Sequence, residues 1–347
     1  MFKSKTVFVV GAGASQEADL PTGTQLKAII AEKLNFTYPP AGIYLDTLTG
    51  DQQVEASLKA YQHQIRQTAD FNPVLHAARK IRNAMPLASS IDTFINDHSD
   101  DEYVGLCGKM AILQSIIEAE QSSKLYFSKY NRETFDPSKL RDTWYIYFSQ
   151  LLFDGVTKKD LENVFNNISF IVFNYDRCVE QYLYNSLQTY YVISPNQADQ
   201  LLENLTIIHP YGDVGGLPWK DVLFGGEIFN RNRVEVAQKL KTFTELQDDQ
   251  AIIPIRQEIQ QAETLVFLGF AFHDLNMKLL TTETESNVRR VFGTVIGISR
   301  EELPIVSNRI WAMLGRSSSG NLSMPLRDGL TCGELFQYFS RNLRQAG

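Results

Sequence analysis

The strongest pattern in the chain is a series of short, continuous apolar runs of strand length. They lie at Val7–Val10, Phe170–Phe173, Leu205–Ile208, Leu265–Leu268 and, with weaker edges, Gly293–Ile298. An apolar run without alternating polar positions is typical of a strand that is buried on both faces, as in a parallel sheet. Helical patterns separate most of these runs. The predicted fold class is therefore α/β, a Rossmann-like parallel sheet with helices on both faces.

Residues 35–165 have a different pattern, in which apolar positions recur at helical spacing. We find no convincing strand there. We therefore predict a single domain over residues 1–347, with a Rossmann-like core at about 1–34 and 166–347 and a helical insertion at about 35–165. The predicted helices of the insertion are Val54–Ala69, Pro73–Met85, Ser90–Asn96, Tyr103–Tyr126, Leu140–Leu152 and a short one at Asp160–Phe165.

Composition narrows the possible environments. The net charge of −7, from 33 basic and 40 acidic residues, argues against binding nucleic acid through bulk electrostatics. No apolar run approaches the ~20 residues of a membrane helix. The three cysteines are widely spaced and form no C-x-x-C, so a disulfide framework and a cysteine-rich zinc site are disfavoured. We interpret Met1–Ser15 as the first core strand rather than a signal peptide, and we predict a cytoplasmic protein.

The first strand leads into a glycine turn, and Thr6–Ser15 reads T-V-F-V-V-G-A-G-A-S. We expect Gly11 to adopt a positive φ and Gly13 to let a ligand approach the backbone. A helix that starts near Ser15 would direct its N–H groups at an anion, such as a nucleotide pyrophosphate. The pattern is incomplete as a dinucleotide fingerprint, because Gln16 occupies the third glycine position of G-x-G-x-x-G.

The stretch after the turn, Leu20-Pro21-Thr22-Gly23, interrupts any helix that begins at Ser15. Thr22 or Thr24 can then cap a helix that runs through Leu26 to Leu34. This loop either covers a ligand at the glycine turn or has only a structural role, and the sequence leaves both interpretations open.

Polar residues and glycines follow the later strands at the corresponding position. Ligands of open parallel sheets bind outside the carboxyl ends of the strands, so these residues outline one candidate crevice with the glycine turn. A single Asn or His in a loop is usually structural, but the recurrence at several strand ends favours a site. The residues are Asn174 and Asp176, then His209 and Gly212, then Gly269, Phe270 and Asp274.

The missing motifs disfavour several chemistries. There is no H-E-x-x-H or paired metal-ligand spacing, so we predict no metal. There is no G-x-S-x-G of a serine hydrolase and no P-loop lysine of an ATPase. Of the five histidines, only His209 directly ends a buried strand, and His273 is its competitor.

Four motifs together resemble the sirtuin family: G-A-G-A-S at Gly11, F-N-Y-D at Phe173, H-P-Y-G at His209 and L-G-F-A-F-H-D at Leu268. The resemblance covers residues 6–34 and 169–300. The chain lacks the four zinc-binding cysteines of the protein deacylases and has L-P-T-G in place of their G-I-P-D-F-R loop. Both departures are similar to the sirtuin-like NADases of bacterial anti-phage defence.

The resemblance implies an NAD⁺ glycohydrolase that depletes NAD during infection (abortive infection), with NAD as substrate. The pyrophosphate would lie on Gly11, Ala12, Gly13 and Ser15, and the nicotinamide–ribose bond near Asn174 and His209. Asn174 would hold the ribose hydroxyls or the attacking water, and His209 would act as the base. Asp176 would stabilise the cationic centre or only cap the next helix. Further NAD contacts are expected from Thr22, Gly212, Gly269, Phe270 and Asp274.

Other functions stay open. The fold could bind NAD or ADP-ribose as a sensor without turnover, and a protein deacylase or a nuclease is less favoured. Control of a toxic NADase would come from homo-oligomerisation or from a partner protein, and a HerA-type ATPase is among the partners that occur in this branch of the family.

Overall fold

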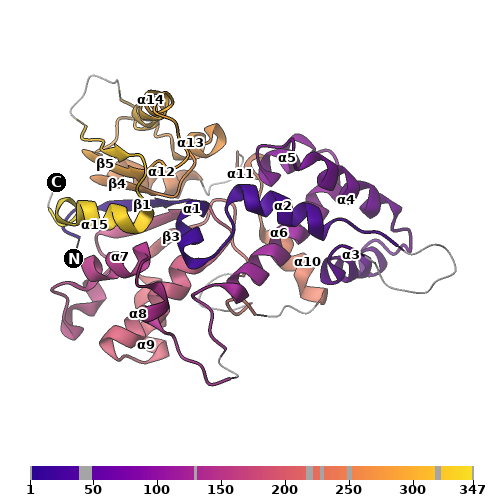
Figure 1. Cartoon of the computed structure of the whole chain (residues 1–347), viewed down its shortest axis with the longest axis horizontal. Coiled ribbons are helices and arrows are strands. Elements are labelled where there is room, and N and C mark those ends of the chain that lie inside the picture. Colours follow the sequence, from indigo (N-terminus) through magenta and orange to yellow (C-terminus); the bar gives the residue numbers. More distant parts are fainter. Residues whose placement is uncertain are drawn as a thin grey trace. The chain divides into compact units, whose positions relative to one another are not determined.

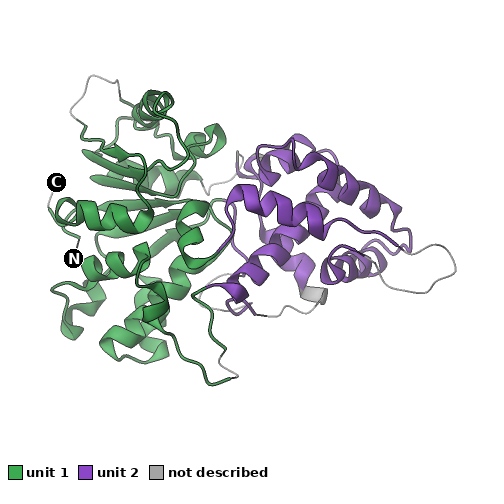
Figure 2. Ribbon diagram, in the orientation of Figure 1, with its two compact units in different colours: residues 1–19, 124–210, 249–347 green, residues 20–123, 211–248 purple. Residues whose placement is uncertain are grey.

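The computed structural model describes residues 2–38, 49–128, 131–215, 222–226, 230–247, 252–316 and 322–345. The chain forms two compact units, which are coloured in Figure 2. Unit 1 consists of residues 1–19, 124–210 and 249–347. Unit 2 consists of residues 20–123 and 211–248. Each unit is described by itself.

Unit 1 contains a six-stranded parallel sheet in the order β3-β2-β1-β4-β5-β6. This confirms the predicted Rossmann-like class, and the order is the one typical of dinucleotide-binding sheets. Val10 pairs with both Val172 and Leu268, so β1, β2 and β4 end level with one another. The strands are β1 Thr6–Val10, β2 Ile168–Val172, β3 Thr206–Ile208, β4 Thr264–Leu268, β5 Arg290–Thr294 and β6 Leu326–Arg327.

Helices cover both faces of the sheet, as can be followed in Figure 1. On one face, the ring of Phe8 packs against Phe148 of α7 (Trp144–Phe153) and Phe336 of α15 (Cys332–Leu343). On the other face, the Ser169 hydroxyl donates to Glu258 of α12 (Ile252–Gln261) at 2.6 Å. Strand residues alternate between these two layers, which explains why β1 and β2 are apolar at nearly every position.

Helix α7 begins four residues after its predicted start at Leu140, and the short helix predicted at Asp160–Phe165 is instead a 3₁₀ turn. The strand predicted at Gly293–Ile298 lies earlier, because the chain turns at Gly297, where φ is +82°. The helices are α1 Ala12–Ser15, α7 Trp144–Phe153, α8 Cys178–Tyr191, α9 Pro195–Glu203, α12 Ile252–Gln261, α13 Asp274–Leu280, α14 Leu303–Met313 and α15 Cys332–Leu343. Three 3₁₀ turns accompany them, η1 Gln16–Ala18, η2 Pro137–Leu140 and η3 Lys158–Asn163.

Unit 2 is helical in its described residues, and the long helix α6 lies at its centre. Helices α2, α3, α4, α5 and α10 all pack against α6, which buries most of its length. The helices are α2 Gly23–Lys33, α3 Gln52–Gln64, α4 Asn72–Ala84, α5 Ile91–Asp97, α6 Glu102–Ser122, α10 Asn230–Lys239 and α11 Phe243–Gln247.

The division into units differs from the insertion predicted at 35–165. Residues 124–165, including α7, belong to unit 1, whereas α2 and residues 211–248 belong to unit 2. The aromatic face of α7 packs on the sheet, and α10 packs on α3 and α6. Helical spacing shows that a segment has an apolar face, but not which core that face joins.

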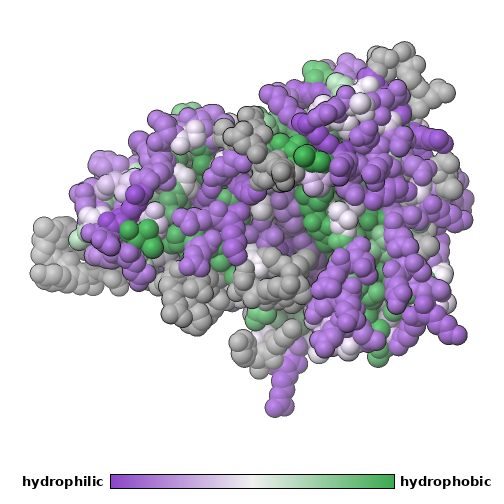
Figure 3. Space-filling model, turned by 180° about the vertical axis from the view of Figure 1, so that it is seen from behind, coloured by the Kyte–Doolittle hydropathy of each residue, from purple (hydrophilic) through white to green (hydrophobic). Residues whose placement is uncertain are grey.

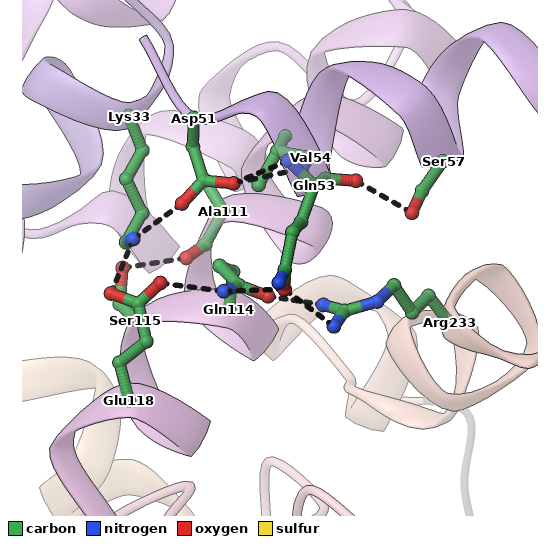
Figure 4. A network of polar contacts seen from close by, with 10 residues as sticks. All are labelled: Lys33, Asp51, Gln53, Val54, Ser57, Ala111, Gln114, Ser115, Glu118 and Arg233. Atoms are coloured by element: carbon green, nitrogen blue, oxygen red, sulfur yellow. Dashed lines mark hydrogen bonds and ion pairs between the residues drawn. The ribbon is translucent and has the colours of Figure 1, made fainter. Parts of the chain in front are cut away.

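A polar network links four helices of unit 2 (Figure 4). The Lys33 ammonium pairs with Asp51 at 2.7 Å and Glu118 at 2.6 Å. The Gln114 amide donates to Glu118 and to Gln53. At its far end, the guanidinium of Arg233 donates to the side-chain oxygens of the same two glutamines.

The face drawn in Figure 3 is mostly hydrophilic, with hydrophobic side chains in scattered small patches. Large apolar side chains that are exposed come from separate elements, for example Leu87, Val192 and Ile296. Among the residues that the structure describes, no helix is both long and apolar enough to cross a membrane.

Candidate functional site

The turns that follow β1 and β4 are in direct backbone contact. The N–H of Gly11 donates to the carbonyl of Leu268 at 2.9 Å, and that of Gly13 donates to the carbonyl of Gly269 at 3.0 Å. A Cβ on Gly11 would lie 2.5 Å from the Gly269 oxygen, and one on Gly13 would lie 2.9 Å from the Gly269 Cα. The two glycines are therefore required where the turns meet, at the point where the strand order reverses.

The positive φ predicted for Gly11 is wrong, because Gly11 is extended with φ −116°. It is Gly269 that adopts the left-handed conformation, with φ +55°, and a Cβ there would lie 2.1 Å from the Ala14 nitrogen. The Gly269 N–H donates to the Thr294 hydroxyl at 2.9 Å. The glycines of the two turns therefore allow the turns after β1 and β4 to approach each other closely, in addition to any ligand that they admit.

Ser15 connects the glycine turn to the end of β2. Its hydroxyl donates to Asp176 Oδ1 at 3.1 Å and accepts a hydrogen bond from Asn174 Nδ2 at 2.8 Å. All three side chains are buried. The residues predicted at the ends of the first two strands are therefore brought together, and Ser15 holds the amide of Asn174 in one orientation.

Asp176 has the capping role, one of the two roles that its sequence position left open, and its role at a cationic centre stays a prediction. Its Oδ1 accepts the Cys178 N–H at the start of α8 at 3.1 Å, and it also holds Ser15. Burial raises the pKa of Asp176, although hydrogen bonds from the Cys178 side chain and N–H and from Ser15 act in the opposite direction.

His209 joins the same cluster from the end of β3. Its Nδ1 lies 3.2 Å from the backbone oxygen of Asn174, and its Nε2 lies 2.6 Å from Glu180 Oε1. Only 8% of the His209 side chain and 2% of the Glu180 side chain are exposed. Glu180 lies in α8, so the histidine is held between β2 and that helix.

Glu17 fixes the glycine turn from its other side. Its carboxylate accepts the N–H of Trp144 at 2.6 Å and that of Gly333 at 2.9 Å, which are the first turns of α7 and α15. The Trp144 indole donates to the carbonyl of Ala14 at 3.1 Å. A carboxylate at two helix N-termini is electrostatically favourable, although burial raises the pKa of Glu17 against the lowering effect of these N–H groups.

Two predicted contact residues near the end of β4 have other surroundings. The ring of Phe270 is buried among Phe173, Phe267 and Phe272. The carboxylate of Asp274, which is 68% exposed, pairs with Arg309 at 2.9 Å. Phe270 is therefore a core residue, and Asp274 is at the surface at the start of α13. Ala12, in the glycine turn, is partly exposed.

Thr22 and Gly212 belong to unit 2. Thr22 caps α2, and its hydroxyl and N–H form a capping box with Gln25. Gly212 has φ +74°, and a Cβ there would lie 2.7 Å from the carbonyl oxygen of Lys239. Local geometry within unit 2 accounts for both residue types.

Two residues of the cluster, Glu180 and Glu17, were not predicted from the sequence. Glu180 follows Asp176 by four residues and lies in the first turn of the helix after β2, so its nearness in sequence to the predicted site residues was the available signal. The pairing of Glu17 with two helices more than 120 residues away has no local signal.

Cys107, Cys178 and Cys332 are all buried, and none of the three forms a disulfide. In the described ranges, no group of three or more His, Cys, Asp or Glu side chains is arranged to hold a metal ion. No family model matches the chain, and no curated protein matches its sequence.

Proposed function

We propose that the protein is an NAD⁺ glycohydrolase that cleaves the nicotinamide–ribose bond to give ADP-ribose and nicotinamide. The observation that carries the proposal is the hydrogen-bonded chain from Ser15 through Asn174 to His209, at the carboxyl ends of β1, β2 and β3. It lies beside the reversal of strand order between β1 and β4, which is where sheets of this order bind their ligands. The family resemblance of the motifs supplies the choice of NAD.

The proposed reaction needs little from the protein besides orientation. The bond from ribose C1′ to the nicotinamide nitrogen breaks with its electron pair going to nitrogen, so a neutral group leaves. A water oxygen then bonds to C1′, and one proton is released. Asn174, whose amide is fixed by Ser15, would orient the water or the ribose hydroxyls, since positioning is a large part of such catalysis. The charge of Asp176 would favour the cationic ribose.

The test is nicotinamide release from NAD by the purified chain. Asn174→Ala and His209→Ala should each lower turnover by at least about 100-fold, the scale expected for loss of a positioning group. Asn166→Ala is the matched control, because Asn166 is exposed in the same unit and its side-chain amide donates to the nearby Asn163. Full activity of both site variants would contradict the proposal.

A second function is favoured by a specific observation. Both ring nitrogens of His209 and the hydroxyl of Ser15 are already engaged within the protein. A site of this kind would suit a sensor that binds NAD or ADP-ribose without turnover. Calorimetry that detects NAD binding while no nicotinamide is released would support this alternative.

The role in anti-phage defence, a homo-oligomeric state and a HerA-type ATPase partner rest on the family resemblance alone. If the isolated chain releases no nicotinamide from NAD, the assay is repeated in the presence of a candidate ATPase. Light scattering on the purified chain gives its oligomeric state.

A further inference from the structure

His209 faces two hydrogen-bond acceptors. Nδ1 points to the backbone carbonyl oxygen of Asn174, which can only accept, and Nε2 points to the carboxylate of Glu180. A neutral imidazole carries one N–H and so can donate to only one of them. The contact of 2.6 Å with Glu180 is short, as expected for a hydrogen bond between charged groups.

The number of protons shared by His209 and Glu180 decides whether both contacts of the ring can be hydrogen bonds. A neutral His209 beside an ionised Glu180 would leave one lone pair of the ring directed at an oxygen lone pair, which is repulsive. One additional proton removes the conflict. In water, imidazole holds a proton more tightly than a carboxylate does, so the additional proton belongs on the ring.

We propose that Glu180 is a positioning residue that keeps His209 doubly protonated, so that His209 holds the backbone of Asn174 and does not act as the base. The carboxylate keeps the charge of the pair balanced within a site that is almost fully buried. In NAD cleavage, the pair of His209 and Glu180 (the dyad) would fix the backbone after the carboxyl end of β2, from which the Asn174 side chain projects. This part of the inference rests on the proposed function, whereas the protonation state does not.

Other polar and charged groups surround the pair of His209 and Glu180. Glu180 Oε2 is buried and has no hydrogen-bond partner among the described residues. The charge of Asp176 interacts with that of Glu180, and Tyr145 interacts with Asp176 and Cys178. Arg177, at the start of α8, is fully buried.

The protonation state is tested by nitrogen NMR on the full chain labelled at its five histidines. The resonances of His209 are those missing from the His209→Gln variant. We expect two protonated ring nitrogens on His209 near neutral pH in the wild type, and only one in Glu180→Gln, which keeps the size of the side chain but removes its charge. Glu258→Gln is the matched control, because it removes a carboxylate of the same unit that bonds Lys5 and Ser169.

Two results overturn the proposal. One is a single protonated nitrogen on His209 in the wild type, and the other is an unchanged His209 spectrum in folded Glu180→Gln. Neither NMR measurement requires NAD turnover, so a result that overturns this proposal can be told apart from a failure of the proposed function.

Turnover adds a second measurement if the chain cleaves NAD. A positioning histidine predicts that wild-type kcat stays flat on the acid side of neutrality, and that Glu180→Gln lowers kcat about tenfold or more, as for other misplaced catalytic groups. A histidine base predicts instead that kcat falls tenfold with each pH unit below its titration, and that result would overturn the positioning role.

Discussion

Each unit of this protein contains a polar cluster, buried in unit 1 and partly buried in unit 2, and the two clusters differ in how well their donors match their acceptors. In unit 2, two cations, Lys33 and Arg233, meet two carboxylates, Asp51 and Glu118, through a pair of glutamine side chains (Figure 4). In unit 1, His209 faces two acceptors, and one oxygen of Glu180 has no partner among the described residues.

The difference separates a stabilising network from a candidate site. A matched network fixes the packing of helices and needs no ligand to complete it. An imbalance of acceptors in a buried place costs free energy, and such costs concentrate at functional sites. We therefore expect changes in the unit 2 network to act on stability, and changes in the unit 1 cluster to act on chemistry.

The largest effect on stability is expected from Gly269→Ala, at the backbone contact beside the unit 1 cluster. The new Cβ would lie 2.1 Å from the Ala14 nitrogen, at a residue with φ +55°. We expect a loss of about 3 kcal/mol in the free energy of unfolding, measured with urea. Gly297→Ala is the matched control, since it has φ +82° but nothing within 4 Å of the new Cβ, and should cost about 1 kcal/mol. Equal losses in the two variants would show that the turn contact is not close.

Lys33→Met tests the unit 2 network. It leaves Asp51 and Glu118 without their shared cation, and we expect about 2 kcal/mol of destabilisation. Lys80→Met, which removes a more exposed partner of Asp101, should cost much less. For molecules that remain folded, NAD turnover should be unchanged, and a loss of turnover without a loss of stability would contradict the comparison.

The same variant has a defined pH dependence. Burial acts to raise the pKa of Asp51, but the hydrogen bond and charge of Lys33, with the N–H groups of Val54 and Gln53, outweigh it and lower the pKa below 3.8. A lowered pKa stabilises the fold above the unfolded value, and this stabilisation is lost as the pH falls through the folded value. The deficit of Lys33→Met should therefore shrink in acid.

Asp176→Asn has the smallest expected effect on stability and the opposite pH dependence. Because burial raises the pKa of Asp176 above 3.8, its contribution to stability is fully present below the unfolded value and is lost as the pH rises through the folded value. Asn cannot ionise, so the stability of the variant relative to wild type should increase as the pH rises above about 4. Unfolding curves at several pH values measure this, and a relative stability that falls with pH would contradict the assigned burial.

Local pattern predicted much of the fold. The buried apolar runs at β1, β2 and β4 have the predicted character and nearly the predicted bounds, because a strand covered on both faces is apolar at most of its positions. The two-residue β6 was missed because so short a strand has no periodicity of its own. The division of helices between the units also escaped prediction, since an apolar face does not identify its partner.

The candidate site was partly predictable in the same way. Asn174, Asp176 and His209 follow strands, and parallel strands bring such residues to one edge. Thr22 and Gly212 were assigned by their place in the motifs, and the structure gives each a local role within unit 2.

The sequence by itself determined that the chain forms a parallel α/β sheet and that its glycines and polar groups follow the strands, since both depend on local spacing and side-chain type. Only the tertiary structure decided the strand order, the contact of Gly11 and Gly13 with Gly269, and the pairing of His209 with Glu180. These depend on contacts between residues far apart in the chain. Their geometry depends on how the strands and helices pack, which no local window of residues contains.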